Sequence, residues 1–90
     1  METDSRAAFV YLLRCRDESL YCGWTFDVEA RLGAHRAGRG ARYTRSRLPV
    51  EVAAVIELAD EASARREEAR IKSLSRMDKL ALVNALTGGR

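Results

Sequence analysis

The stretch Phe9-Val10-Tyr11-Leu12-Leu13-Arg14-Cys15, with Leu20-Tyr21-Cys22-Gly23-Trp24-Thr25 close behind it, decides the fold. Both segments are rich in residues that favour strands, and the polar Asp17-Glu18-Ser19 between them is typical of a turn. Together they predict a β-hairpin. Each arm is apolar at odd and even positions alike, which indicates a strand pair covered on both faces.

The length of the hairpin loop decides whether the two tyrosines can share a pocket. Side chains alternate between faces along a strand, so Tyr11 and Tyr21 share a face only if the loop holds an odd number of residues. A three-residue loop over 17–19 pairs Cys15 with Tyr21 and Tyr11 with Thr25. A two-residue loop places the phenols on opposite faces.

A helix is predicted over residues 28–36, because Asp27 before it is a good N-cap. Arg31 and His35 lie four residues apart on this helix and therefore project from the same flank. Gly33 weakens the helix by about 1 kcal/mol relative to alanine. A basic loop is expected to follow the helix, up to the third strand.

The third strand is predicted over residues 50–58, a helix over 60–74, and a last helix from Ser75, which begins a capping-box pattern. The expected fold is a small α/β domain: a three-stranded, mainly antiparallel sheet flanked by helices, in the order β-β-α-β-α-α. One domain is expected over residues 8–87, and residues 1–7 are expected to be disordered.

Composition places the chain among soluble globular proteins, with 47% hydrophobic and 32% charged residues. The apolar runs are too short to span a bilayer, and the polar N-terminus does not resemble a secretory signal, so we expect a cytoplasmic protein with no membrane partner. The two cysteines, Cys15 and Cys22, fall within or beside predicted strands and are expected to be free apolar fillers.

The positive charge is concentrated in one segment. Residues 30–50 contain six of the sixteen basic residues, all arginine, and no acid, so the remaining ten bases face all thirteen acids. An acidic body with one basic segment favours a polyanionic partner held at that segment. The alternative is a solubilising loop with no specific partner.

Several motifs in order resemble the GIY-YIG endonuclease superfamily, in particular its small stand-alone bacterial proteins and the nuclease module of the UvrC repair protein. They are Val10-Tyr11-Leu12, Tyr21-Cys22-Gly23, Thr25-Phe26-Asp27 with Arg31 and His35, the string 38–45, and Glu68-Ala69-Arg70-Ile71-Lys72-Ser73-Leu74-Ser75-Arg76. The first motif keeps only the tyrosine of the usual Gly-Ile-Tyr. Without the resemblance, composition favours the interpretation of the tyrosines as half-buried strand residues.

The resemblance implies a catalytic set of Tyr11, Tyr21, Arg31, His35 and Glu68. Tyr11 is expected to take the proton of the attacking water, Tyr21 to orient the water or the phosphate, and Arg31 to bind the scissile phosphate. His35, the only histidine, is expected to be an assisting base or a phosphate donor. Helical periodicity does not choose between Glu67 and Glu68, whereas the resemblance places the metal-binding acid at Glu68.

The expected cofactor is a divalent metal, Mg²⁺ or Mn²⁺, held by Glu68 with waters and phosphate oxygens. The expected partner is DNA, with single-stranded or branched forms favoured and duplex allowed, and the chain is expected to be a monomer or a weak dimer. Expected DNA contacts combine basic side chains with groups that can stack on a base or bind phosphate: Trp24, Arg36, Arg39, Arg42, Tyr43, Thr44, Arg45, Arg47 and Lys72.

The sequence thus predicts a metal-dependent DNA endonuclease that hydrolyses phosphodiester bonds in repair, recombination or processing of DNA. A second hypothesis is a non-catalytic nucleic-acid-binding module that acts with repair proteins. A third is a protein-interaction domain. Metal-dependent nicking of DNA separates the first from the other two.

Overall fold

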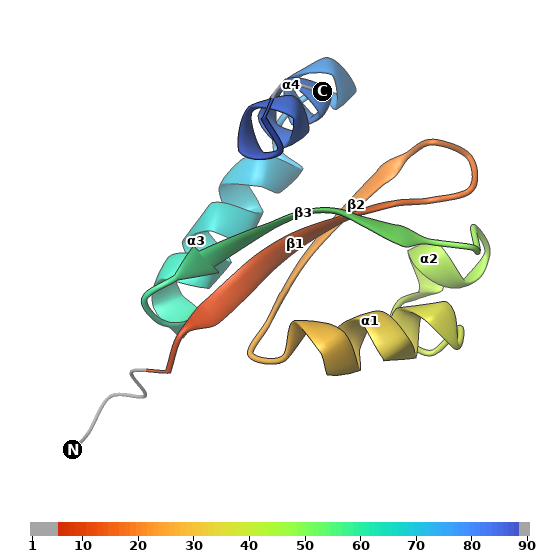
Figure 1. Ribbon diagram of the computed structural model, residues 1–90, viewed down its shortest axis with the longest axis horizontal. Coiled ribbons are helices and arrows are strands. Elements are labelled where there is room, and N and C mark those ends of the chain that lie inside the picture. Colours follow the sequence, from red (N-terminus) through yellow and green to blue (C-terminus); the bar gives the residue numbers. More distant parts are fainter. Residues whose placement is uncertain (1–5, 89–90) are drawn as a thin grey trace.

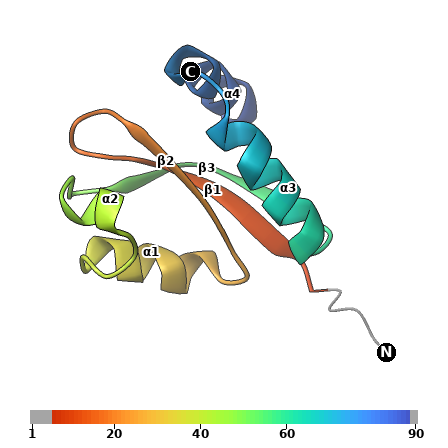
Figure 2. The same cartoon turned by 180° about the vertical axis from the view of Figure 1, so that it is seen from behind.

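The computed structural model describes residues 6–88 of the 90-residue chain and shows a three-stranded sheet between two groups of helices (Figures 1 and 2). The elements, in chain order, are β1 (Ala8–Arg14), β2 (Leu20–Thr25), α1 (Val28–Arg36), α2 (Arg42–Arg45), β3 (Glu51–Leu58), α3 (Glu61–Lys72) and α4 (Arg76–Leu86). The predicted sheet flanked by helices is confirmed. The predicted order lacked α2, which lies within the segment expected to be a basic loop.

The strands are all antiparallel, in the spatial order β2-β1-β3, so β1 is central and β2 and β3 are the two edges. Helices α1 and α2 lie on one side of the sheet, and α3 and α4 lie on the other (Figure 1). This arrangement confirms that the hairpin is covered on both faces, and it explains why both arms lack a regular polar alternation.

The hairpin loop has three residues, as predicted, but begins one residue earlier. The Cys15 amide donates to the Ser19 carbonyl at 2.9 Å, and the Glu18 amide donates to the Cys15 carbonyl at 2.9 Å. Glu18 has φ 69°, in the left-handed region. These are the features of a turn followed by a left-handed bulge residue, which closes a three-residue loop over 16–18.

The predicted register of the hairpin is therefore wrong by two residues. Tyr11 pairs with Gly23 and not with Thr25, and Leu13 pairs with Tyr21. The odd loop length is nevertheless correct, because the ring centroids of Tyr11 and Tyr21 are 6.4 Å apart on one face. A non-glycine residue in the left-handed conformation carries no sequence signal, which is why the shift was not foreseen.

Alternate residues of β1 divide between two hydrophobic cores. Val10 and Leu12 are fully buried with Ile71 of α3 in the larger core, on the side of α3 and α4. Tyr11 and Leu13 belong to the smaller core, against which α1 packs. The catalytic candidates on β1 and β2 thus belong to the smaller core.

The predicted caps Asp27 and Ser75 are confirmed, and Asp60 caps α3 in the same way. Asp27 accepts a hydrogen bond from the Ala30 amide at 3.0 Å, at the start of α1. Asp60 accepts from the Ser63 amide at 2.8 Å. The hydroxyl of Ser75 accepts from the Asp78 amide at 3.1 Å and begins α4. Each cap satisfies an amide that has no partner within its helix.

The N-terminal end of the described chain packs on the loop after β2. Residues 1–5, most of the predicted disordered segment, lie outside the described residues, while the guanidinium of Arg6 stacks on Phe26 at 3.9 Å.

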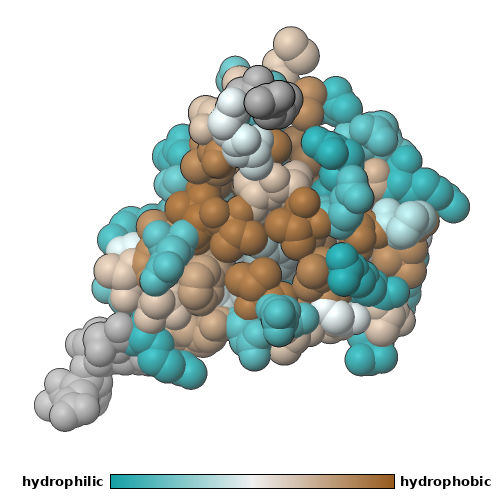
Figure 3. All heavy atoms as spheres, in the orientation of Figure 1, coloured by the Kyte–Doolittle hydropathy of each residue, from teal (hydrophilic) through white to brown (hydrophobic). Residues whose placement is uncertain are grey.

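Apolar groups gather in the middle of the face in Figure 3, and the exposed apolar residues of the domain include Val52 and Val55 of β3. Within residues 6–88, no helix is long and apolar enough to cross a membrane.

Candidate active site

Three aromatic rings from different elements meet on the α1 side of the sheet. His35 of α1 lies 5.6 Å from Tyr11 of β1 and 5.2 Å from Tyr21 of β2, measured between ring centroids, and both contacts are edge-to-face. Tyr11 and His35 are 3% and 0% exposed, whereas Tyr21 is half-buried. The fold therefore brings the two tyrosines predicted for the site and the only histidine into one cluster.

A chain of hydrogen bonds runs through the imidazole. The Tyr11 hydroxyl lies 2.9 Å from Nε2 of His35, and Nδ1 of His35 lies 2.8 Å from the Thr44 hydroxyl oxygen. The Thr44 hydroxyl donates its only hydrogen to the Ala41 carbonyl at 3.2 Å. With its hydrogen donated to Ala41, Thr44 accepts from Nδ1–H, and in this tautomer Nε2 is unprotonated and can accept the phenol hydrogen of Tyr11.

Arg31 supplies positive charge to the same phenol. Its Nε donates to the Tyr11 oxygen at 3.4 Å, and its Nη2 donates to the Gly40 carbonyl at 2.9 Å. The carbonyl contact fixes the guanidinium between α1 and the loop before α2. The predicted pairing of Arg31 and His35 on one flank of the helix is confirmed, because both reach Tyr11.

Burial and charge set the protonation states of the cluster. Burial raises the pKa of Tyr11 above its usual value, and the hydrogen bond from Arg31 opposes that rise. Burial lowers the pKa of His35, and the positive charge of Arg31 lowers it further. At neutral pH the site therefore holds a neutral phenol next to a neutral imidazole that can accept its proton.

Two glycines make room for these rings. An added Cβ at Gly23, the partner of Tyr11 across the ladder, would lie 2.5 Å from the Tyr11 hydroxyl oxygen. An added Cβ at Gly40 would clash with the ring of His35. Tyr11 thus lies across the backbone of β2, and its hydroxyl reaches the outer edge strand. Glycine in a strand is a known signal of such close approach.

A second stack connects this cluster to α2 and the hairpin loop. The ring of Tyr43 stacks on Tyr21, with 5.9 Å between centroids and 28° between planes. The guanidinium of Arg47 covers Tyr43 at 3.8 Å and pairs with Asp17 at 3.0 Å. Tyr43 is 39% exposed, with Tyr21 and Arg47 among its ring contacts, and the stacking of a base on it stays a prediction.

Glu68 lies in the other layer, on α3. Its carboxylate is 3.4 Å from the Lys72 ammonium, and 21% of its side chain is exposed. Burial, and then the negative charge of Glu68, raise the pKa of the Cys22 thiol to about 11, which places this carboxylate near β2. Glu68 and Tyr11 therefore approach consecutive residues of the edge strand, Cys22 and Gly23, from opposite faces of the sheet.

Glu67 is engaged differently from Glu68. Both its oxygens accept from Arg70, at 2.9 and 2.8 Å, and this fork lowers the pKa of Glu67. Glu68 has only the single, longer contact with Lys72. A carboxylate without a bidentate partner is more easily recruited by a metal, so the geometry favours Glu68 of the two.

The described residues 6–88 contain no group of three or more His, Cys, Asp or Glu side chains that could hold a metal. Mg²⁺ commonly uses one or two carboxylates together with waters and substrate phosphates. Glu68, half-buried and weakly paired beside the edge strand, fits that use.

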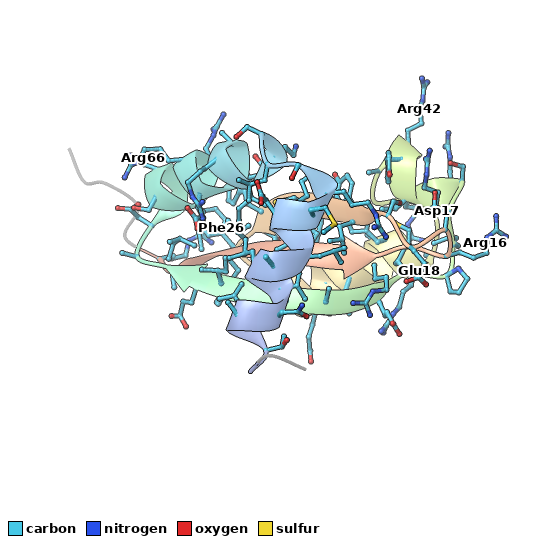
Figure 4. The ribbon with its side chains drawn as sticks, turned by 90° about the horizontal axis from the view of Figure 1, so that it is seen from above. Arg16, Asp17, Glu18, Phe26, Arg42 and Arg66 are labelled. Atoms are coloured by element: carbon cyan, nitrogen blue, oxygen red, sulfur yellow. The ribbon has the colours of Figure 1, made fainter. Side chains whose placement is uncertain are left out.

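The arginines of the basic segment differ in their exposure. Arg42 points away from α2 into solvent, at the same end of the molecule as Asp17 of the hairpin loop (Figure 4). Within residues 6–88, no ion pair involves the exposed Arg36, Arg39, Arg42 or Arg45. These four carry exposed positive charge, whereas Arg47 is half-buried and paired with Asp17.

Other predicted DNA contacts lie elsewhere. Thr44 is 0% exposed and turned toward His35, which is incompatible with direct contact to DNA. Trp24 is half-buried on the α3 side, where its ring packs edge-to-face on Phe26 with 5.2 Å between centroids. Lys72 pairs with Glu68, which lies four residues earlier on the same helix.

Comparison with known proteins gives consistent results. The GIY-YIG catalytic domain family matches residues 7–81. A UPF0213 protein of Oceanobacillus iheyensis is 51% identical over 75 residues, covering 83% of this chain and 87% of the relative. A UPF0213 protein of Natronomonas pharaonis is 48% identical over 80 residues, covering 89% and 94%. The solution NMR structure of a UPF0213 protein from Bacillus halodurans is 40% identical and has a TM-score of 0.59, covering 88% of this chain and 84% of that one.

Proposed function

Because this chain belongs to the GIY-YIG catalytic domain family, and to its UPF0213 group of small single-domain proteins, we propose that it is a metal-dependent DNA endonuclease that hydrolyses phosphodiester bonds. The observation that supports this proposal best is the hydrogen-bond chain from Tyr11 through His35 to Thr44. A tyrosine with only a structural role would not need a buried, neutral imidazole that is placed to accept its proton.

In the proposed reaction Tyr11 is the general base and His35 assists it. A phenol is a poor base at neutral pH, and burial of Tyr11 makes its anion still less accessible. As the phenol oxygen takes a proton from the attacking water, its own proton passes to Nε2 of His35. Thr44 holds His35 in the required tautomer from the other side. The complete burial of His35 supports the assisting-base role over the phosphate-donor role.

Arg31 and Tyr21 hold the scissile phosphate in this proposal. The guanidinium of Arg31 is fixed by the Gly40 carbonyl and lies beside the phenol that acts on the water. A charged donor already in place stabilises the negative charge that develops on the phosphoryl oxygens. Tyr21 is half-buried next to His35, with its hydroxyl available to orient the water or the phosphate.

The edge strand β2 is the proposed place of reaction. Tyr11 reaches it at Gly23 and Glu68 approaches it at Cys22, so a phosphate beside this edge could meet both groups. Glu68 would hold Mg²⁺ or Mn²⁺ there, and the bound cation would supply positive charge to the phosphate oxygens. Lys72, paired with Glu68, would keep that carboxylate in position in the absence of the cation.

We propose single-stranded or branched DNA as the substrate, in repair, recombination or processing of DNA. One flexible strand can follow the edge of a sheet, while the unpaired Arg36, Arg39, Arg42 and Arg45 contact its phosphates. Contacts of that kind supply affinity without sequence information. The four-residue α2 is too short to act as a recognition helix in a major groove.

The decisive test is a cleavage panel with labelled single-stranded, forked and duplex DNA, with Mg²⁺, with Mn²⁺ and with chelator. We expect cleavage only with metal. Tyr11→Phe and Glu68→Gln should each lower the rate about 100-fold or more with DNA binding retained, because each removes a group that acts on the reacting atoms. Glu67→Gln, on the adjacent residue, is the matched control and should cleave normally.

Normal cleavage by Tyr11→Phe would rule out the proposed base. Binding without products on every substrate and metal would instead favour a non-catalytic nucleic-acid-binding module. One observation supports that second candidate: Glu68 and the phenols lie on opposite faces of the sheet, and no hydrogen bond connects them within residues 6–88.

A further inference from the structure

A basic pocket lies beside the start of β2, next to the proposed active site but outside it. It has a volume of about 180 Å³ and is lined by Ser19, Leu20, Tyr43, Arg76 and Lys79. These residues come from the hairpin, α2 and α4, so the pocket bridges the two layers of helices at the outer edge of the sheet. Arg76 is the last residue of the motif string that begins at Glu68, and the catalytic proposal assigns Arg76 no role.

The lining carries two cations and no acid. Nη2 of Arg76 donates to the Glu18 carbonyl at 3.0 Å, which holds the guanidinium at the hairpin and leaves its other N–H groups for a ligand. Within residues 6–88, neither Arg76 nor Lys79 forms an ion pair. Lys79 is only partly exposed and lines the pocket.

The rest of the lining suits a nucleotide. Leu20 and the ring of Tyr43 provide apolar surface beside the two cations. Tyr43 is held in place by its stack on Tyr21 and its cover by Arg47, so this wall is preformed. A phosphate between two cations, with its sugar against an apolar wall, matches the chemistry of one nucleotide unit.

We propose that this pocket binds a phosphate of the substrate strand, at a nucleotide away from the one that is cleaved. Tyr43 contacts both sites, because it lines the pocket and stacks on Tyr21 of the catalytic cluster. The strand then lies along β2, with one phosphate at Arg76 and Lys79 and the scissile phosphate at Arg31. The identity of the ligand as a DNA strand rests on the proposed function, whereas its phosphate chemistry rests on the pocket.

The test is binding of a labelled single-stranded oligonucleotide in chelator, across a salt series, so that cleavage plays no part. Lys79→Gln should raise Kd about 3- to 10-fold and lower the slope of log Kd against log salt by about 0.7, the value for one phosphate contact on a single strand. Lys79→Arg should restore both. Arg66→Gln removes the same charge on α3, at the opposite side of the molecule from the hairpin residues Asp17 and Glu18 (Figure 4), and should leave the slope almost unchanged.

Amide chemical shifts in the wild-type protein give a second readout. The oligonucleotide should shift the signals of Ser19, Leu20 and Lys79. An unchanged slope in Lys79→Gln, or shifts at these amides with inorganic phosphate but not with the oligonucleotide, would overturn the proposal. Binding at the pocket without cleavage on any substrate would refute the endonuclease and leave this inference standing. Normal cleavage by the wild-type protein, together with an unchanged salt slope in Lys79→Gln, would support the endonuclease and refute this inference.

Discussion

The two faces of the sheet are built for different purposes. On the α3 and α4 side, two of the three arginines of α3 form ion pairs within the helix, Arg65 with Glu61 and Arg70 with Glu67, over an apolar core. On the α1 and α2 side, the exposed arginines have no ion pairs within residues 6–88, and the core contains a phenol and an imidazole. Three of the four basic side chains of α3 are thus in ion pairs within the helix, whereas the exposed arginines on the α1 and α2 side of residues 6–88 are not.

This difference shows where stability and chemistry are located. Surface ion pairs add little to stability, so the α3 layer depends on its buried aliphatic residues. The α1 layer buries polar rings, and each buried polar group there has a hydrogen-bond partner, as it must to avoid a large desolvation cost. Glu68 is the exception among the proposed catalytic residues, because it belongs to α3 and not to the α1 layer.

The largest expected effect comes from breaking the stable layer. Ile71→Ala removes a side chain that is 0% exposed and should lower the free energy of unfolding by about 3 kcal/mol, a large share of the stability of a domain this size. Chemical denaturation measures the change. Cleavage per folded molecule should remain close to normal. Leu32→Ala, at a half-buried site in α1, is the comparison variant and should cost less. Equal losses would contradict the division between the layers.

A smaller effect is expected from a single added methyl group in the other layer. Gly23→Ala places its Cβ 2.5 Å from the Tyr11 hydroxyl, so the ring must move away from His35, and cleavage should fall about 100-fold. Gly33→Ala is the matched control, because nothing lies within 4 Å of its added Cβ. The control should cleave normally and unfold about 0.5–1 kcal/mol less readily, since alanine favours the helix. Full activity in Gly23→Ala would contradict the proposed position of Tyr11.

The smallest effect concerns pH. Because the pKa of His35 is lowered on folding, its neutral form prevails at neutral pH, and the cleavage rate should be insensitive to this group between about pH 6.5 and 8. As pH falls through the folded pKa, below about 6.5, Nε2 becomes protonated and the rate should decline. A rate that rises on acidification would instead identify the imidazolium as a phosphate donor.

The free energy of unfolding, like the cleavage rate, should fall as pH is lowered. The unfolded chain takes up the histidine proton near pH 6.5, before the folded protein does, so the free energy of unfolding falls as pH drops from about 6.5 to the folded pKa. Denaturation curves at several pH values, compared with those of His35→Asn, isolate this contribution. The variant should lack this part of the pH dependence.

Much of the fold could be predicted from local patterns. The strands, the helices α1, α3 and α4, and the caps Asp27, Asp60 and Ser75 follow from side-chain chemistry that acts within a few residues. Helix α2 was missed because four residues carry no periodicity. The hairpin register was missed because it depends on one residue, Glu18, in an unusual backbone conformation.

The candidate site was predictable only in part, because motifs identify residues but not the contacts between distant segments. Tyr11, Tyr21, Arg31 and His35 were identified, and the structure brings them together. The contact of Thr44 with His35 joins two separate segments, and no pattern in the sequence indicates it. The role of Gly23 could have been found, since a glycine inside a strand signals close approach of another group.

That glycine has a consequence for how the chain can vary. The space that Gly23 leaves is filled by the phenol of Tyr11, so the two positions constrain each other across the ladder. A descendant that gains a side chain at one position must shorten the ring at the other, and would lose the base in doing so. Residues 11 and 23 therefore form one mutational unit, although only one of them has a functional group.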